Sequence, residues 1–217
     1  MAELKLDELN ILSGDSENNE LDGFDYEEFI EHYFDPMQLS KKQKEKRKEL
    51  SKELMDIILY FLIWCEDYPD RVTTEETQEE FQNKYKEKVL DYAEPSTFFD
   101  TYIPLFIATL IDTTLSHKGE TYFTSVERAA VVAVNESNHI FGNEDYENAK
   151  ALGKQYKVWR TELDERVRPT HRLVEGKKVP IDEPFLVGES LMMYPKDDSL
   201  GASADEIVNC RCVCSYS

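Results

Sequence analysis

Apolar residues recur every three or four positions through most of residues 25–152, which is the spacing of helices that bury one face. Prolines and glycines interrupt this pattern at intervals and mark where each helix should end. The pattern therefore predicts helices over residues 25–33, 40–67, 73–94, 96–117, 124–141 and 145–152.

Polar residues are expected to start several of these helices. Ser40 is the expected N-cap of the long second helix. Thr73 to Glu76 and Thr124 to Glu127 have the spacing of a capping box, in which a hydroxyl and a carboxylate satisfy free backbone amides. Pro104 lies inside the fourth helix and predicts a kink or a restart there.

The pattern changes after Gly153. The remaining residues are rich in proline, glycine and β-branched side chains, and they give short strand candidates in place of long helical runs. The strand candidates are residues 156–160, 173–174, 178–181, 191–194 and 207–215. The sequence therefore predicts an α+β fold, with a helical N-terminal region followed by a small α+β domain of short antiparallel strands.

Composition refines this division. The formal net charge is −20, and residues 1–39 hold 12 acidic residues against one lysine. We predict a disordered acidic arm over residues 1–23, a helical region over 24–119 and the α+β domain over 120–217. The longest uninterrupted apolar run, residues 57–65, is too short to cross a bilayer, and no signal peptide is seen, so we expect no membrane partner and reduced thiols.

Two short segments are basic within this acidic chain. Residues 40–53 and 156–178 each carry seven basic residues, against three and four acidic ones. Contact with DNA is one interpretation of these segments. The other is that they form solvated helix faces, which we favour for residues 40–53.

Three of the four cysteines stand at alternate positions near the end of the sequence: Cys210, Cys212 and Cys214. In a regular strand they would form one column of thiols, with Arg211 on the opposite face. His171, Cys210 and Cys212 would supply three ligands for zinc, although Cys-x-Cys on a regular strand rarely converges on one ion. The two interpretations are a zinc site and packed thiols beside a hydrogen-bonded histidine. We expect the second, with no cofactor.

An ordered set of motifs runs through the C-terminal half. It comprises a helix with Arg128 and Glu136, then Trp159-x-Thr161, Asp164-x-x-Val167-Arg168-x-x-His171, Gly176, Phe185, Pro195-x-Asp197, and Asn209-Cys210-Arg211-Cys212. This order resembles the head morphogenesis domain of tailed bacteriophages, the Mu F-like minor head protein family. One departure is Leu173-Val174-Glu175-Gly176, where that family usually has Leu-Asp-Gly after the histidine.

The resemblance implies a minor head protein and not an enzyme. Such a protein would associate with the portal and other head proteins in the host cytoplasm, enter the virion and aid genome delivery. The residues that the resemblance marks as structural are Glu136, Trp159, Asp164, Arg168, His171, Asn209, Cys210, Arg211 and Cys212.

Physical chemistry suggests a buried polar network for these residues. Arg168 could form a bidentate pair with Asp164 or Glu136, His171 could bond the backbone, and the cysteines could pack under Trp159. Cys214 is the thiol expected to be most exposed.

Two other functions stay open at this point. A metal-dependent hydrolase or nuclease would use His171 with Asp164 or Glu165 as its acid and base. A toxin-delivering protein would carry an effector domain, since Mu F-like domains are sometimes fused to one, but we expect no such payload after residue 217.

Overall fold

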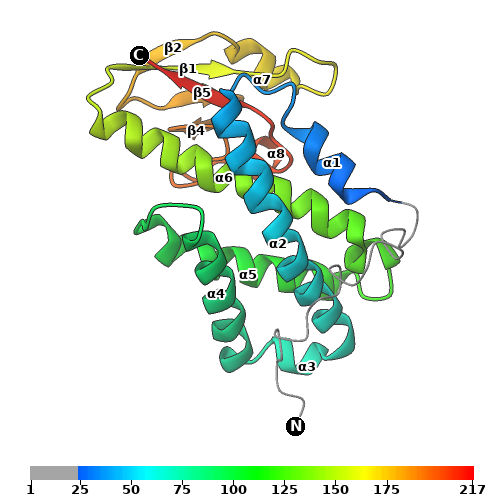
Figure 1. Ribbon diagram of the computed structural model, residues 1–217. Coiled ribbons are helices and arrows are strands. Elements are labelled where there is room, and N and C mark those ends of the chain that lie inside the picture. Colours follow the sequence, from blue (N-terminus) through cyan, green and yellow to red (C-terminus); the bar gives the residue numbers. More distant parts are fainter. Residues whose placement is uncertain (1–23) are drawn as a thin grey trace. The chain divides into compact units, whose positions relative to one another are not determined.

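The computed structural model describes residues 24–217, so the predicted acidic arm over residues 1–23 lies outside the described residues. The described chain forms two compact units (Figure 1). One unit contains residues 24–31 and 49–133, and the other contains residues 32–48 and 134–217. Two long helices, α2 (Lys41–Asp67) and α6 (Val126–Ala151), each supply residues to both units.

The first unit is helical, as predicted for this part of the chain. Its elements are α1 (Tyr26–Tyr33), the second half of α2, α3 (Pro69–Val72), α4 (Glu75–Leu90), α5 (Phe98–Ser116), a 3-10 turn (Thr121–Thr124) and the start of α6. Aromatic side chains fill its core: Phe61 of α2 stacks on Phe81 of α4 with ring centroids 3.8 Å apart. Tyr85 of α4 contacts Phe106 of α5 at 5.0 Å. Phe81 and Tyr85 are fully buried, so the aromatic residues of α4 contribute to this core.

The helix starts differ from the predicted capping boxes by one residue. Ser40 caps α2 as expected, because its hydroxyl accepts from the Gln43 amide at 3.3 Å while the Gln43 side chain accepts from the Ser40 amide. Thr74, and not Thr73, caps α4, since the Thr73 hydroxyl donates back to the Asp70 carbonyl. Ser125, and not Thr124, accepts from the Arg128 amide at 3.1 Å and starts α6.

Helix α5 continues through Pro104, so the helix does not restart there. By length and composition it could cross a membrane: its most apolar 18-residue window has a mean hydropathy of 1.2, and 39% of that window is buried. The core helix of a soluble protein passes the same test. The expectation of no membrane partner was based on the length of uninterrupted apolar runs, and α5 contains no long run of this kind. That expectation therefore stays a prediction.

Two predicted helices are one in the structure. Helix α6 runs from Val126 to Ala151 through Gly142, where the sequence suggested an end. A glycine inside a helix costs about 1 kcal/mol relative to alanine. Buried side chains on both sides of it, including Phe141 and Tyr146, hold the helix together, so tertiary packing outweighs the local preference.

The second unit contains a three-stranded antiparallel sheet in the order β2-β1-β5. Its strands are β1 (Tyr156–Arg160), β2 (Lys178–Pro180) and β5 (Val213–Tyr216), and a separate hairpin joins β3 (Phe185–Val187) to β4 (Ser190–Met192). Trp159 pairs with Cys214 across β1 and β5. The α+β fold predicted from the sequence is confirmed.

One predicted strand is wrong, and another is wrong in part. Residues 173–174 end a helix, α7 (Pro169–Val174), because Pro169 favours the first turn of a helix. Within residues 207–215, Ile207 ends α8 (Ala204–Ile207) and β5 begins only at Val213. Asn209 has a φ of 55°, a left-handed conformation that asparagine tolerates and that a strand does not allow.

Side chains from one face of the sheet form the core of this unit. Trp159 packs with Val174 of α7, Phe185, Val187 and Met192 of the hairpin, and the two cysteines Cys210 and Cys212. A neighbouring cluster joins Tyr146 and Ala149 of α6 to Ile181 and Tyr194. Cys214 and Tyr216 of β5 pack against this second cluster, so the C-terminal half of α6 lies against the sheet (Figure 1).

Candidate functional site

A histidine, two cysteines and a glutamate meet in the interior of the second unit. The Nδ1 atom of His171 lies 3.3 Å from the Cys212 sulfur and 3.6 Å from the Cys210 sulfur. Its Nε2 atom lies 2.9 Å from Oε2 of Glu206. His171 and Cys210 are each 1% exposed, so this histidine–cysteine cluster is closed to solvent.

The glutamate determines how the imidazole faces the sulfurs. A carboxylate only accepts hydrogen bonds, so Nε2 of His171 carries the proton and donates it to Glu206. Nδ1 then presents its lone pair to both thiols. Glu206 is fixed in turn, because the Thr170 hydroxyl donates to its Oε2 atom at 2.8 Å.

Three elements bring the cluster together. His171 comes from α7 and Glu206 from α8, while Cys210 and Cys212 lie between α8 and β5. Gly188 in the β3–β4 turn has a φ of +59°, and a Cβ atom there would collide with Oε1 of Glu206. Glycine at this position therefore serves both the turn and the close approach of the carboxylate.

Trp159 packs against the histidine–cysteine cluster. It is fully buried, and its ring meets the His171 ring edge to face at 5.5 Å and the Phe185 ring at 5.2 Å. The prediction that the cysteines pack near Trp159 is confirmed by the shared core.

The two thiols differ in their tendency to ionise. The hydrogen bond from Cys212 is the largest influence on Cys210; together with His171 and Lys196 it holds the pKa of Cys210 well below its usual range despite burial. Cys212 is the donor in that bond, and this role, with burial, raises its pKa. Burial lowers the pKa of His171, but the neighbouring Cys210 outweighs it and raises the pKa overall. Cys210 is thus the thiol that ionises first.

A second polar layer lies beside the cluster. The Nζ atom of Lys196, which is 4% exposed, donates to Oδ1 of Asn135 at 2.8 Å, and the Asn135 amide donates to Oδ1 of Asn209 at 3.0 Å. Burial lowers the pKa of Lys196, and the charges of Cys210 and Glu136 oppose that effect. Glu136 is itself buried on α6.

Two predicted ion-pair partners are different in the structure. Asp164 accepts two hydrogen bonds from Arg211, at 2.8 and 2.7 Å, and so pairs with Arg211 and not with Arg168. Arg168 donates to the carbonyl oxygen of Val208. The side chain bonded to His171 is Glu206, so the suggested pairing of His171 with Asp164 or Glu165 in a hydrolytic site is not formed, and Glu165 is exposed.

Glu162 also lies in this region, and sequence reasoning gave it no role. Neither of its carboxylate oxygens has a hydrogen-bond partner within the described residues, and both are buried. Burial raises its pKa to about 7, although the charge of Arg211 acts in the opposite direction.

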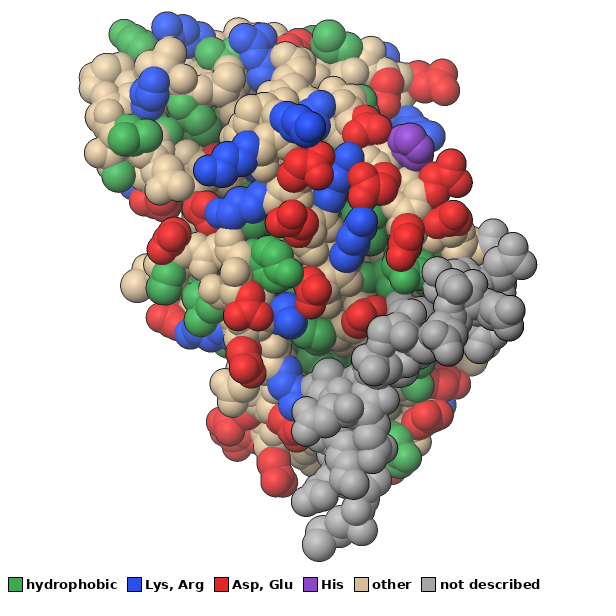
Figure 2. Space-filling model, viewed as in Figure 1, with side chains coloured by type: hydrophobic (Ala, Val, Ile, Leu, Met, Phe, Trp, Pro, Cys, Tyr) green, Lys and Arg blue, Asp and Glu red, His purple; other side chains and the backbone are tan. Residues whose placement is uncertain are grey.

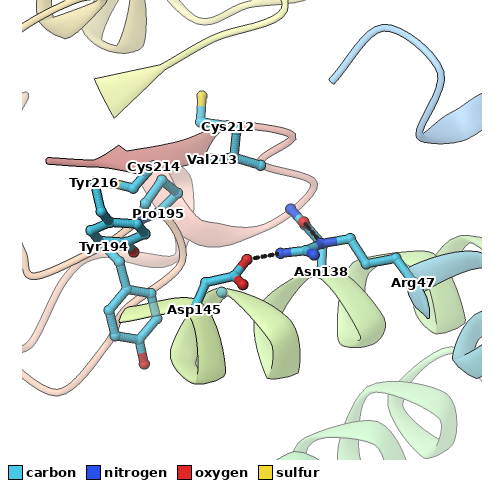
Figure 3. Close-up of a pocket in the computed structure, with 10 residues that line it drawn as sticks. Arg47, Asn138, Asp145, Tyr194, Pro195, Cys212, Val213, Cys214 and Tyr216 are labelled. Atoms are coloured by element: carbon cyan, nitrogen blue, oxygen red, sulfur yellow. Dashed lines mark hydrogen bonds and ion pairs between the residues drawn. The ribbon is translucent and has the colours of Figure 1, made fainter. Parts of the chain in front are cut away.

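The first basic segment is largely used inside the second unit. Arg47 is 1% exposed and donates to Asp145 at 2.8 Å and to Asn138 at 3.1 Å (Figure 3). Lys46 pairs with Glu144 and Lys48 with Asp35, both within the same unit. A fully solvated helix face is therefore wrong for Arg47 and Lys48, because acidic residues in the same unit compensate their charges.

These residues belong to a small pocket that also includes β5. Its lining includes Arg47, Asp145, Tyr194, Cys214 and Tyr216. Cys212 lies at its border, with its sulfur directed away from Asp145 and Arg47 (Figure 3). Cys214 is half-buried and is more exposed than Cys210, Cys212 and Cys65, as predicted.

Charge is interspersed over the face drawn in Figure 2. Lysine and arginine side chains there lie among aspartates and glutamates and form no continuous basic patch on that face of the described residues. Contact with DNA through the basic segments stays a prediction.

The predicted residues are thus partly brought together. His171, Cys210, Cys212 and Trp159 share one core, while Asp164 and Arg211 form a separate ion pair. Glu206 and Lys196 were missed, since only the fold brings them to residues far away in sequence. Glu206 is a charged residue in a short segment without a motif, so the sequence gave no signal for its role.

The fold and the cluster define an α+β protein whose C-terminal unit is organised around a buried network of polar side chains and thiols. The family model for phage Mu protein F like protein matches residues 70–215. The chain belongs to this family, and the match includes all four residues of the histidine–cysteine cluster.

A curated relative shares part of the chain. The NAD(+)–arginine ADP-ribosyltransferase EFV of Enterococcus faecalis is 31% identical over 99 residues, which is 45% of this chain and 20% of the relative. The match thus spans about a fifth of the length of that protein. No solved structure matches the chain significantly.

Proposed function

We propose that this protein is a minor head protein that acts in phage head morphogenesis, binds the portal and is packaged in the virion after assembly in the host cytoplasm. The observation that carries the proposal is the family match over residues 70–215. Aid in genome delivery is part of the same proposal.

Features of the helical unit support a docking role. Leu105 on α5 is 57% exposed, and Phe98, Tyr102 and Phe106 stack along the same helix with centroids 4.8 and 6.2 Å apart. A helix that leaves apolar side chains at the surface fits contact with another protein. We place the portal contact on this surface of α5.

Co-purification with the portal protein tests the proposal. The full chain is co-expressed with the portal protein of the phage that encodes it, and the complex is isolated by size exclusion. We expect the chain to elute with the portal ring and to be found by mass spectrometry in purified virions. A folded chain that elutes alone, and that virions lack, would refute the proposed function.

Matched leucine substitutions test the surface. Leu105→Asp introduces a charge at the proposed contact and should reduce recovery with the portal at least tenfold. Leu173→Asp alters a leucine that is 85% exposed on the other unit and should leave recovery unchanged. Equal recovery of both variants would contradict the placement on α5 while leaving portal binding itself intact.

A further inference from the structure

Three potential metal ligands converge within the second unit. Nδ1 of His171 and the sulfurs of Cys210 and Cys212 all lie within 4.8 Å of one another. All three residues are buried. Nitrogen and sulfur donors in this combination suit a borderline-soft divalent cation such as zinc.

The spacing of the donors agrees with a tetrahedral site. Zinc bonds of about 2.3 Å to sulfur and about 2.0 Å to nitrogen, at tetrahedral angles, place nitrogen and sulfur about 3.5 Å apart. In the structure the two nitrogen–sulfur distances are 3.3 and 3.6 Å. A zinc ion would therefore fit between these atoms with small movements.

The imidazole has the orientation that a metal ligand needs. Glu206 accepts the Nε2 proton at 2.9 Å, which leaves the Nδ1 lone pair directed at the sulfurs. A carboxylate on the distal nitrogen is the usual outer partner of a metal-bound histidine, because it fixes the tautomer and raises ligand basicity. Thr170 holds this carboxylate in place.

The backbone removes the main objection to a Cys-x-Cys pair. On a regular strand two such side chains share a face but seldom converge on one ion. Here Asn209 adopts a φ of 55°, the Cys210 amide bonds the Ile207 carbonyl at 3.1 Å, and the strand starts only at Val213. The irregular segment lets both sulfurs approach the same imidazole nitrogen.

Charge balance also favours a cation of charge +2. Zinc with two thiolates and a neutral imidazole is neutral as a unit, which avoids the cost of an uncompensated charge in the interior.

We propose that His171, Cys210 and Cys212 bind one zinc ion, with Glu206 as the outer carboxylate. The ion joins α7, α8 and the segment before β5, so its role is structural. This inference goes beyond the role in head assembly and does not depend on it.

Metal analysis of the full chain tests the site. Protein purified from cells grown with added zinc should contain about one zinc per chain, and zinc should raise the Tm of the metal-free protein. Cobalt added to metal-free protein should give thiolate-to-cobalt charge-transfer bands and the visible bands of tetrahedral coordination. Folded protein that takes up neither metal would overturn the proposal and leave packed thiols as the correct description.

Cysteine variants supply the matched control. Cys212→Ser should reduce the zinc content at least tenfold, and it should reduce the thiolate-to-cobalt charge-transfer bands of the cobalt-treated protein by at least half. Cys65→Ser and Cys214→Ser should retain the ion. Circular dichroism establishes that each variant is folded. If Cys212→Ser does not fold, alkylation rates of the wild-type chain with and without zinc, located by mass spectrometry, decide the same question. Cys65, Cys210 and Cys212 are all buried, so only the protection that zinc adds is informative. Zinc should slow the alkylation of Cys210 and Cys212, and equal rates with and without zinc at both residues would contradict the assignment.

Discussion

Acid sensitivity should arise from one buried histidine. His139 on α6 is 4% exposed, and its ring centroid lies 6.4 Å from that of Tyr194. Burial, and then the charge of Lys196, lowers its pKa from 6.5 to about 3. The native protein therefore holds this histidine neutral at pH values where the unfolded chain protonates it.

The magnitude follows from the two pKa values. Between pH 6.5 and 3 the unfolded state binds more protons than the native state, so the free energy of unfolding falls as the pH falls. With an unfolded pKa of 6.5 and a native pKa of about 3, the loss is small at pH 7 and reaches about 2 kcal/mol at pH 5. This contribution is specific to His139.

Urea denaturation of wild type and His139→Gln at pH 7 and pH 5 isolates this contribution from those of other groups. The free energy of unfolding of the variant, relative to wild type, should improve by about 2 kcal/mol on going from pH 7 to pH 5. His32→Gln removes an exposed histidine that pairs with Asp35 at 3.1 Å, and it shows the effect of losing a histidine that is not buried. If the difference between His139→Gln and wild type is constant within about 0.5 kcal/mol over this range, the histidine is not held neutral and the reasoning is wrong.

Two further substitutions test buried charges of the second unit. Glu162→Gln, in chelator-treated protein, should raise the free energy of unfolding at pH 8 by about 1–2 kcal/mol, a value reduced from about 3 kcal/mol because the side chain as a whole is only half-buried. The gain should disappear below pH 4.5, since a native pKa of about 7 penalises only the ionised carboxylate. An effect that does not change with pH would contradict this. Arg47→Met should lower the free energy of unfolding by about 2–4 kcal/mol, because it leaves Asp145 without its buried partner. Lys42→Met, at an exposed position of the same helix, should leave the stability unchanged. Equal denaturation midpoints for the two variants would show that the Arg47 pair adds no stability.

The sequence predicted most helices because the apolar residues that recur every three or four positions are the residues that form the core. The errors fall where local signals compete with packing. Gly142 is a reasonable helix end by propensity, yet α6 passes through it because the flanking residues are buried. The capping boxes were displaced by one residue because Thr73 and Thr124 stand beside another hydroxyl residue that can cap equally well.

The site was predictable in its members and less so in its bonds. The motif order indicated that His171, Cys210 and Cys212 matter, and the fold does bring them together. The pairing of Asp164 with Arg211 and of His171 with Glu206 could not be derived, since each depends on how α7, α8 and the last segment meet. Alternation within residues 210–214 suggested one strand, and the left-handed Asn209 shows why alternation alone was insufficient.

The polar residues of this unit explain how such short strands adopt one arrangement. The strands of the two sheets have three to five residues, too few to determine their pairing through hydrophobic contacts alone. Several buried polar groups instead have a partner on another part of the unit: Glu206 with His171, Lys196 with Asn135, and Asn135 with Asn209. A wrong arrangement would leave these groups buried without partners, at about 1–3 kcal/mol for each neutral group and more for a charge. The network therefore penalises alternative packings more strongly than it stabilises the native one, and a metal at His171 would add to this selectivity by joining the same elements.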